Sequence, residues 1–174
     1  VTVLELDSWQ LQGFGEDKIS PHISVFTTFF PDHMNYYKDN MKKYFADKAN
    51  IFKYQTKSDF LISSKQAQPF IEKWGEKIKS KIIISKDTLP KGFKFNLPGF
   101  HNKHNAVLAA EVAKILLIPE AQIKKALATF ASLSGRLEFL REVNGVKIYK
   151  EDIGHDMTDK LFRKYLKIFI KNLK

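Results

Sequence analysis

The chain has 174 residues and a formal net charge of +10, with 29 lysines and arginines against 19 aspartates and glutamates. A hydrophobic fraction of 44% and 15 phenylalanines exclude a disordered protein and predict one with a sizeable core. The absence of cysteine excludes disulfides, thiolate metal sites and cysteine nucleophiles, and favours a cytoplasmic location. No apolar run approaches the roughly 18 residues of a membrane-spanning helix, and no secretion leader opens the chain, so we expect neither.

The positive charge alone does not predict a nucleic-acid interface. Lysines far outnumber arginines and are spread along the whole chain. Base readout relies mainly on arginine, and a surface that follows phosphates needs clustered charge. The sequence therefore favours solvated lysines over nucleic-acid binding, while an anionic substrate or nucleotide stays compatible with the charge.

Apolar β-type runs alternate with helical patterns through the first three quarters of the chain. The predicted strands cover residues 1–6, 23–29, 59–64 and 81–86. The predicted helices cover residues 34–55, 68–79, 101–117 and 120–133. This alternation is typical of an α/β protein, in which helices flank a parallel sheet.

The pattern changes after Gly135. Residues 137–151 form two β-type runs joined by Asn144-Gly145, which is a strong hairpin signal. Residues 159–174 have the pattern of a basic amphipathic helix. We therefore predict one domain over residues 1–135 and the start of a second, truncated domain over 136–174.

Acidic and histidine residues follow the first two predicted strands. Glu5 lies at the end of the first strand, and Asp32 and His33 form a turn after the second. Parallel sheets bind ligands at the carboxyl ends of their strands, where a carboxylate often holds Mg²⁺ over a phosphate. The alternatives are a strand-edge Glu5 paired with a lysine, and a His33 that only shapes its turn.

Lys48 shares the apolar stripe of its predicted helix with Tyr44 and Phe52, so we expect it to point inward. Burial disfavours the charged amine and lowers its pKa, which makes the amine nucleophilic. A neutral amine can capture CO₂ as a carbamate, an anionic metal ligand. The alternative is a lysine whose amine extends along the surface to water.

Asn102 and Asn105, in the segment LPGFHNKHN, lie three residues apart at the start of a predicted helix. Their amides could read an adenine edge, because each donates and accepts hydrogen bonds. Asn102 is equally well explained as a helix cap. The chain contains neither GxxxxGK[ST] nor GxGxxG, so it lacks a loop that cradles phosphates.

Five segments, in this order, resemble motifs of the Mur ligases of peptidoglycan synthesis. They are LELDSWQL, PDHMNYY, YFADKANIF, LPGFHNKHNAVLAA and LSGRLEFLREVNGVKIY. The likeness runs from residue 1 to about 149 and is greatest to the members that add D-glutamate. It implies that residues 1–135 are the C-terminal part of a central ATP-binding domain and that the start of a C-terminal domain follows. In this family the phosphate-binding loop lies upstream of the segment present here.

The resemblance implies ATP and Mg²⁺ as cofactors. ATP would phosphorylate the carboxylate of UDP-N-acetylmuramoyl-L-alanine, and the amine of D-glutamate would attack the acyl phosphate to form an amide. Glu5 would help bind one Mg²⁺, while His33 and a carbamylated Lys48 would serve a second. Charge neutralisation at the phosphoryl group is the physical demand that these ions meet.

Four further residues match family positions that contact ligands. Gln10 corresponds to a contact with the nucleotide-sugar, and Asn102, Asn105 and Arg136 to contacts with the ATP nucleotide. After Tyr149 the sequence KEDIGHD departs from the family pattern, and the tail has no likeness to the domain that would bind D-glutamate.

Three hypotheses follow from the resemblance and its limits. In the first, the chain is a partial ligase that is inactive alone. In the second, a complementary chain or self-association completes the enzyme. In the third, the chain is a basic binding module whose last helix docks on an acidic partner, nucleic acid or a membrane surface.

Overall fold

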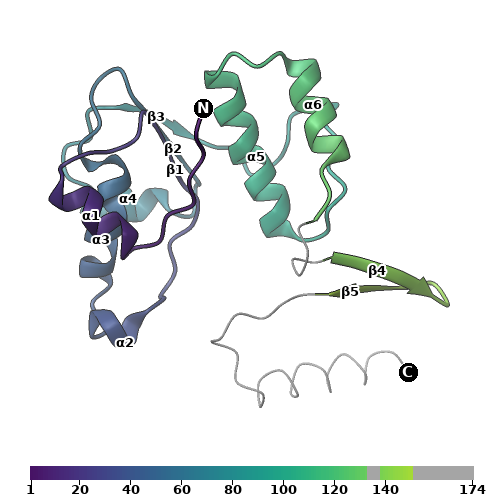
Figure 1. Ribbon diagram of the computed structural model, residues 1–174, viewed down its shortest axis with the longest axis horizontal. Helices are drawn as coiled ribbons and strands as arrows, with labels where there is room; N and C mark the ends of the chain where they lie inside the picture. Colours follow the sequence, from purple (N-terminus) through teal and green to yellow (C-terminus); the bar gives the residue numbers. More distant parts are fainter. Residues whose placement is uncertain (133–137, 151–174) are drawn as a thin grey trace. The chain divides into compact units, whose positions relative to one another are not determined.

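The computed structural model describes residues 1–132 and 138–150 (Figure 1). The chain divides into two compact units, the first ending at Thr129 and the second beginning at Phe130. The predicted domain boundary at 135–136 and the predicted basic helix over 159–174 lie outside the described residues. No helix in the described ranges is long and apolar enough to cross a membrane.

The first unit contains a three-stranded parallel sheet. Its strands are β1 (Ile23–Phe26), β2 (Phe60–Ser63) and β3 (Lys81–Ile84), in the spatial order β1-β2-β3. Parallel strands need crossover connections, and helices supply both of them here. The α/β prediction is confirmed, and three of the four predicted strands are present in shorter form.

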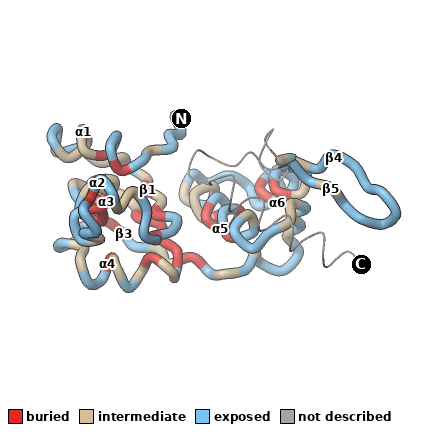
Figure 2. Tube along the Cα trace, turned by 90° about the horizontal axis from the view of Figure 1, so that it is seen from below, coloured by how far each residue is buried: buried red, intermediate tan, exposed pale blue. Residues whose placement is uncertain are grey.

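An aromatic core packs between this sheet and the helices that follow β1 and β2. These helices are α2 (Met34–Tyr37), α3 (Met41–Lys53) and α4 (Gln68–Trp74). The buried residues of this core, many of them in the red segments of Figure 2, are Phe26, Phe29, Tyr37, Tyr44, Phe45, Ala49, Phe52, Leu61, Ala67 and Ile71. The β1–α3 crossover thus gives α3 a fixed inward face.

The predicted strand over residues 1–6 is wrong. Residues 1–7 have no regular secondary structure, and Val1, Val3 and Leu4 are exposed. An apolar alternation becomes a strand only where a neighbouring strand completes its backbone hydrogen bonds, and no strand in the described part pairs with these residues. A short helix that the sequence pattern did not predict, α1 (Gln10–Glu16), follows instead.

The single helix predicted over 34–55 is also wrong, because the chain breaks between α2 and α3. Lys38 and Asp39 both have left-handed backbone conformations, with φ of 51° and 56°. Asn40 then caps α3 by accepting a 3.0 Å hydrogen bond from the N–H of Lys43. In the same way, the helix predicted over 68–79 ends at Trp74, before Gly75.

Two further helices complete the first unit. Helix α5 (Phe100–Ile115) lies against β2, and α6 (Glu120–Thr129) packs on α5. Their shared core contains Ala106, Ala110, Ile123 and Leu127. The predicted helix over 101–117 is confirmed, and the one over 120–133 ends four residues earlier than expected.

The second unit contains the predicted hairpin, formed by β4 (Glu138–Val143) and β5 (Val146–Lys150). Asn144 and Gly145 both have positive φ, 50° and 80°. These values are those of a two-residue type I′ turn, which matches the twist of antiparallel strands. The hairpin prediction is confirmed.

Candidate functional site

An open pocket of about 390 Å³ gathers the four residues that the resemblance assigns to metal ions or to the nucleotide-sugar. We call it the site pocket. Its lining residues come from the N-terminal segment, the turn before α2, and α3: Glu5, Leu6, Asp7, Ser8, Gln10, Asp32, His33, Tyr44 and Lys48. Glu5 and Gln10 therefore share one space with His33 and Lys48, which lie much further along the sequence.

The imidazole of His33 is held between a carboxylate and an indole. Its Nε2 lies 3.4 Å from Oδ2 of Asp32, and its ring centroid lies 4.4 Å from that of Trp9. The backbone N–H of His33 also donates a 2.8 Å hydrogen bond to Oδ1 of Asp32. These contacts fix a residue whose own φ of 53° is left-handed. The turn places the ring toward the N-terminal segment, and α2 starts directly after it.

Lys48 projects from α3 and is partly buried, as its position on the apolar stripe predicted. Its amine lies 5.4 Å from the ring centroid of Tyr44, one helical turn earlier. Burial lowers the pKa of Lys48, and the negative charges of Asp32 and Asp7 oppose this shift without cancelling it. The amine is therefore more easily deprotonated than that of an exposed lysine.

Lys48 also reaches the carboxyl end of β1. It lines a small cavity of about 60 Å³ together with Thr27 and Thr28, the two residues that follow this strand. The carboxyl end of a parallel strand is where α/β proteins commonly bind ligands. The position of Lys48 beside it agrees with the ligand edge that the sequence predicted.

Gln10 and Asp7 hold one another at the start of α1. The side chain of Gln10 accepts a 2.9 Å hydrogen bond from the N–H of Asp7, and Asp7 Oδ1 accepts a 2.8 Å hydrogen bond from the N–H of Gln10. This reciprocal pair has the spacing of a capping box, which explains why a helix begins here. The Gln10 amide N–H groups stay available to a ligand in the pocket, since only its oxygen serves this pair.

Glu5 is exposed and lies in the irregular N-terminal segment rather than at the end of a strand. Together with Asp7 and Asp32 it supplies carboxylates to the site pocket. No three His, Asp or Glu residues of the described ranges are grouped closely enough to hold a metal ion by themselves. Mg²⁺ usually keeps several waters and binds one or two carboxylates plus substrate phosphates. The donors fit such a shared ion, and they do not form a closed protein site.

The predicted adenine residues lie elsewhere in the first unit, on the first turns of α5. The amide of Asn102 donates a 2.8 Å hydrogen bond to the carbonyl of Pro98, which ties the helix start to the preceding turn. Asn105 is exposed. Neither residue lines the site pocket. Arg136 lies outside the described residues.

Sequence reasoning assigned no role at the site to Tyr44 or Trp9. Tyr44 lines the pocket below Lys48, and burial, followed by the charge of Asp32, raises its pKa to about 12. Trp9 covers the ring of His33. The i, i+4 spacing of Tyr44 and Lys48 could have indicated that Tyr44 lies beside Lys48. The contact of Trp9 with His33 depends instead on the position of α1, which the sequence pattern did not predict.

Comparison with known proteins shows which family shares this arrangement. The model of the Mur ligase middle domain matches residues 1–91. The UDP-N-acetylmuramoylalanine–D-glutamate ligase of Pediococcus pentosaceus is 32% identical over 174 aligned positions, covering 89% of this chain and 38% of the relative. The ligase of the same name from Clostridium kluyveri is 33% identical, covering 90% and 37%. The chain thus spans little more than a third of the length of these relatives.

Solved structures show the same fold at lower identity. MurF from Acinetobacter baumannii superposes with a TM-score of 0.58 at 17% identity, covering 72% of this chain and 32% of that one. The murein peptide ligase of Psychrobacter arcticus superposes with a TM-score of 0.55 at 14% identity, covering 89% and 36%.

Proposed function

Because the chain belongs to the Mur ligase family, we propose that it carries part of the active site of an ATP-dependent ligase that adds D-glutamate to UDP-N-acetylmuramoyl-L-alanine. The relatives named above carry this activity in their names. The observation that carries the proposal is the site pocket, in which Glu5, Gln10, His33 and Lys48 come together. Its proposed location is the cytoplasm, because a chain without cysteine fits a compartment in which proteins rarely form disulfides.

The reaction transfers a phosphoryl group to a carboxylate and then exchanges phosphate for an amine. Bound Mg²⁺ would supply the positive charge that offsets the charge developing on the transferred group. Glu5 would hold one ion, and His33 with a carbamylated Lys48 would hold another. Asp32 keeps the imidazole of His33 in place through its 3.4 Å contact.

Lys48 is suited to carbamylation because burial favours its neutral amine. The amine nitrogen forms a bond to the carbon of CO₂ and releases a proton, which leaves an anionic carbamate. This change replaces a cation by an anion among Asp7, Asp32 and Glu5 and raises the negative charge available to metal ions. The Gln10 amide would contact the nucleotide-sugar, and Asn102, Asn105 and Arg136 the ATP nucleotide.

The ligase reaction itself is the first test. ADP release is measured with ATP, Mg²⁺ and both substrates, using the chain alone and the chain mixed with the residues of the Pediococcus relative that precede and follow its match. The proposal expects ADP release that depends on D-glutamate, and that is lost in Lys48→Gln and His33→Ala. Lys42→Gln, an exposed lysine on α3, is the matched control and should keep activity. Release that requires another amino acid, or a mixture that stays inactive although it binds Mg·ATP, would contradict the proposal.

Carbamylation is tested separately by ¹³C NMR of the chain in ¹³C-labelled bicarbonate. We expect a carbamate resonance that disappears in Lys48→Gln and persists in Lys42→Gln. A resonance that survives the Lys48 substitution would assign the carbamate to another amine.

A further inference from the structure

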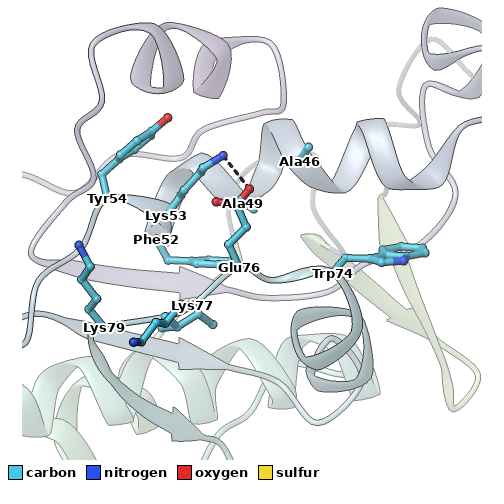
Figure 3. Close-up of a pocket in the computed structure, with 10 residues that line it drawn as sticks. Ala46, Ala49, Phe52, Lys53, Tyr54, Trp74, Glu76, Lys77 and Lys79 are labelled. Carbon is cyan, nitrogen blue, oxygen red and sulfur yellow. Dashed lines mark hydrogen bonds and ion pairs between the residues drawn. The ribbon is translucent and has the colours of Figure 1, made fainter.

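A second pocket, of about 260 Å³, lies between α3 and the segment that follows α4 (Figure 3). Its α3 side includes Ala46, Ala49 and Lys53, which recur at three and four residues and so share one helix face. Tyr44 and Lys48, which line the site pocket, lie on a different face. The two pockets have no lining residue in common.

The apolar lining of the second pocket is anchored in the core. Phe52 and Ala49 are 2% and 7% exposed and belong to the aromatic core cluster. The ring of Trp74 lies against that cluster, with its centroid 5.7 Å from Phe45 and 5.6 Å from Phe70. An apolar ligand would therefore meet preformed ring and methyl surfaces, which saves the cost of ordering them on binding.

Residues 75–79 form the outer wall of the second pocket, and Gly75 determines the direction in which this segment leaves α4. The N–H of Gly75 donates a 2.8 Å hydrogen bond to the carbonyl of Ile71, and a Cβ at this position would collide with that same oxygen. The chain therefore turns sharply out of α4 and passes alongside α3. Glu76 then contacts Lys53 at 3.3 Å, which joins the wall to the helix (Figure 3).

The charge around this pocket is unbalanced. Of its three lysines only Lys53 has an acidic partner, Glu76; Lys77 and Lys79 make no ion pair or hydrogen bond with any residue in the described ranges. Figure 3 shows the amines of Lys77 and Lys79 toward one end and the indole of Trp74 toward the other. The pocket thus has a cationic end and an aromatic end.

We propose that this second pocket binds a small organic anion, with its carboxylate or phosphate at Lys77 and Lys79 and a flat apolar body against Phe52 and Trp74. A volume below the roughly 300 Å³ at which drug-sized sites begin limits the body to about one ring. The positive charge of the two lysines attracts the anionic group of the ligand, and burial of its ring favours ligands that carry a ring over those that do not.

The test uses the 174-residue chain with phenyl phosphate as the probe. The chain has two tryptophans, so Trp9→Phe leaves Trp74 as the single indole reporter. We expect saturable quenching of Trp74 fluorescence with a dissociation constant on the order of 1 mM. Benzyl alcohol, which lacks the anion, and inorganic phosphate, which lacks the ring, should each bind at least about threefold more weakly, because each loses one of the two contributions.

Two double variants in the Trp9→Phe background separate this pocket from general surface charge. Lys77→Gln with Lys79→Gln should weaken phenyl phosphate about three- to tenfold, because two exposed charge contacts are lost. Lys91→Gln with Lys94→Gln, exposed lysines that do not line the pocket, should leave binding unchanged. Circular dichroism checks that each variant is folded. Absence of saturation, equal binding of inorganic phosphate, or equal weakening by both double variants would overturn the proposal.

Discussion

Gln12 and Asp47 are joined by a 2.7 Å hydrogen bond from Nε2 to Oδ2, although 35 positions separate them in the chain. The same oxygen of Asp47 accepts a 2.9 Å hydrogen bond from the hydroxyl of Tyr37. One carboxylate therefore connects α1, α2 and α3, and two of these helices, α1 and α3, supply residues to the site pocket. Asp47 directly precedes Lys48, so this connection also fixes the helix turn from which Lys48 extends.

Asp47→Ala should lower the free energy of unfolding by about 1–3 kcal/mol, because two donors lose a charged acceptor. Asp47→Asn keeps an acceptor oxygen and should lose less. Glu16→Ala removes an exposed carboxylate from α1 and should change stability by under about 0.5 kcal/mol. Urea unfolding of the three variants measures these differences. An Asp47→Ala protein as stable as Glu16→Ala would show that the connection contributes nothing.

Two glycines in α1 should respond to alanine with opposite signs. A Cβ at Gly15 would lie 2.5 Å from Nδ2 of Asn50, the amide that donates a 3.0 Å hydrogen bond to the carbonyl of Leu11. Gly15→Ala must therefore displace this amide, with loss of its hydrogen bond, or shift α1. We expect a loss of about 1–3 kcal/mol. A Cβ at Gly13 has nothing within 4 Å, so Gly13→Ala should stabilise the helix by about 0.5–1 kcal/mol.

Thermal and urea unfolding of both glycine variants give the comparison directly. Because the two substitutions are chemically identical and two residues apart, their difference isolates the contact with Asn50. Equal effects from the two would mean that α1 is not packed on α3 as described.

Tyr37 should be among the last tyrosines to ionise. Burial, together with its hydrogen bond to Asp47 and the charge of that carboxylate, raises the pKa of Tyr37 from 10.0 to about 12. The neutral phenol is the form that the fold stabilises, so this contribution is complete below pH 10.0 and is lost as the pH rises toward about 12.

An ultraviolet titration of tyrosinate follows the six tyrosines of the chain. Tyr37→Phe should remove one group from the highest-pH part of the curve, where Tyr44 also titrates with a pKa of about 12. It should also flatten the fall of stability above pH 10.0. If Tyr37→Phe removes a group from the early part of the curve instead, the assigned environment of Tyr37 is wrong.

Asp59 should contribute stability that acid removes. The N–H of Thr56, 2.6 Å from Oδ2, and then the imidazole of His22, 2.7 Å from Oδ1, hold the pKa of Asp59 below its ordinary value of 3.8. The carboxylate is the stabilised form, so its contribution is present above pH 3.8 and is lost as the pH falls through the lower folded pKa.

Asp59→Asn should therefore be less stable than the parent chain near neutral pH, and the gap should close as the pH falls to about 2. Urea unfolding across this range measures it. His22→Gln, which replaces the imidazole that contacts Asp59 by an amide, should lose part of the same stability. A difference between parent and Asp59→Asn that stays constant with pH would rule out ionisation as its cause.

The sheet was predictable because its strands are short apolar runs that alternate with helical sequence, and each run has a neighbouring strand with which to pair. The run containing Val1, Val3 and Leu4 has the same pattern but no paired strand in the described part, and it is not a strand. Local sequence shows that a segment can form a strand. Whether it does so depends on a neighbouring strand with which it can pair.

The break between α2 and α3 was hidden by continuity of the apolar pattern. Tyr37, Met41 and Tyr44 keep helical spacing across Lys38 and Asp39, so periodicity predicted one helix. The left-handed conformations of Lys38 and Asp39 end α2 there, and Asn40 caps the start of the next helix, α3. The sequence feature that indicated the break was Asn40, because asparagine is a preferred N-cap residue. The helical spacing of the apolar residues around it nevertheless favoured one continuous helix.

At the candidate site the chemical types were predictable and the orientations were not. The apolar stripe of α3 placed Lys48 inward, and the motif spacing brought attention to His33. The capping pair of Gln10 with Asp7 and the bond from Asn102 to Pro98 depend on backbone turns that periodicity does not describe. Each is a side chain whose hydrogen bonds follow from local geometry.

The order β1-β2-β3 in space repeats the order of the strands along the chain. Among the described strands, each pairs with the strand that directly precedes or follows it in the chain. Contacts between segments near in sequence lower the entropic barrier to folding and speed it. Pairing among these three strands can therefore proceed in chain order.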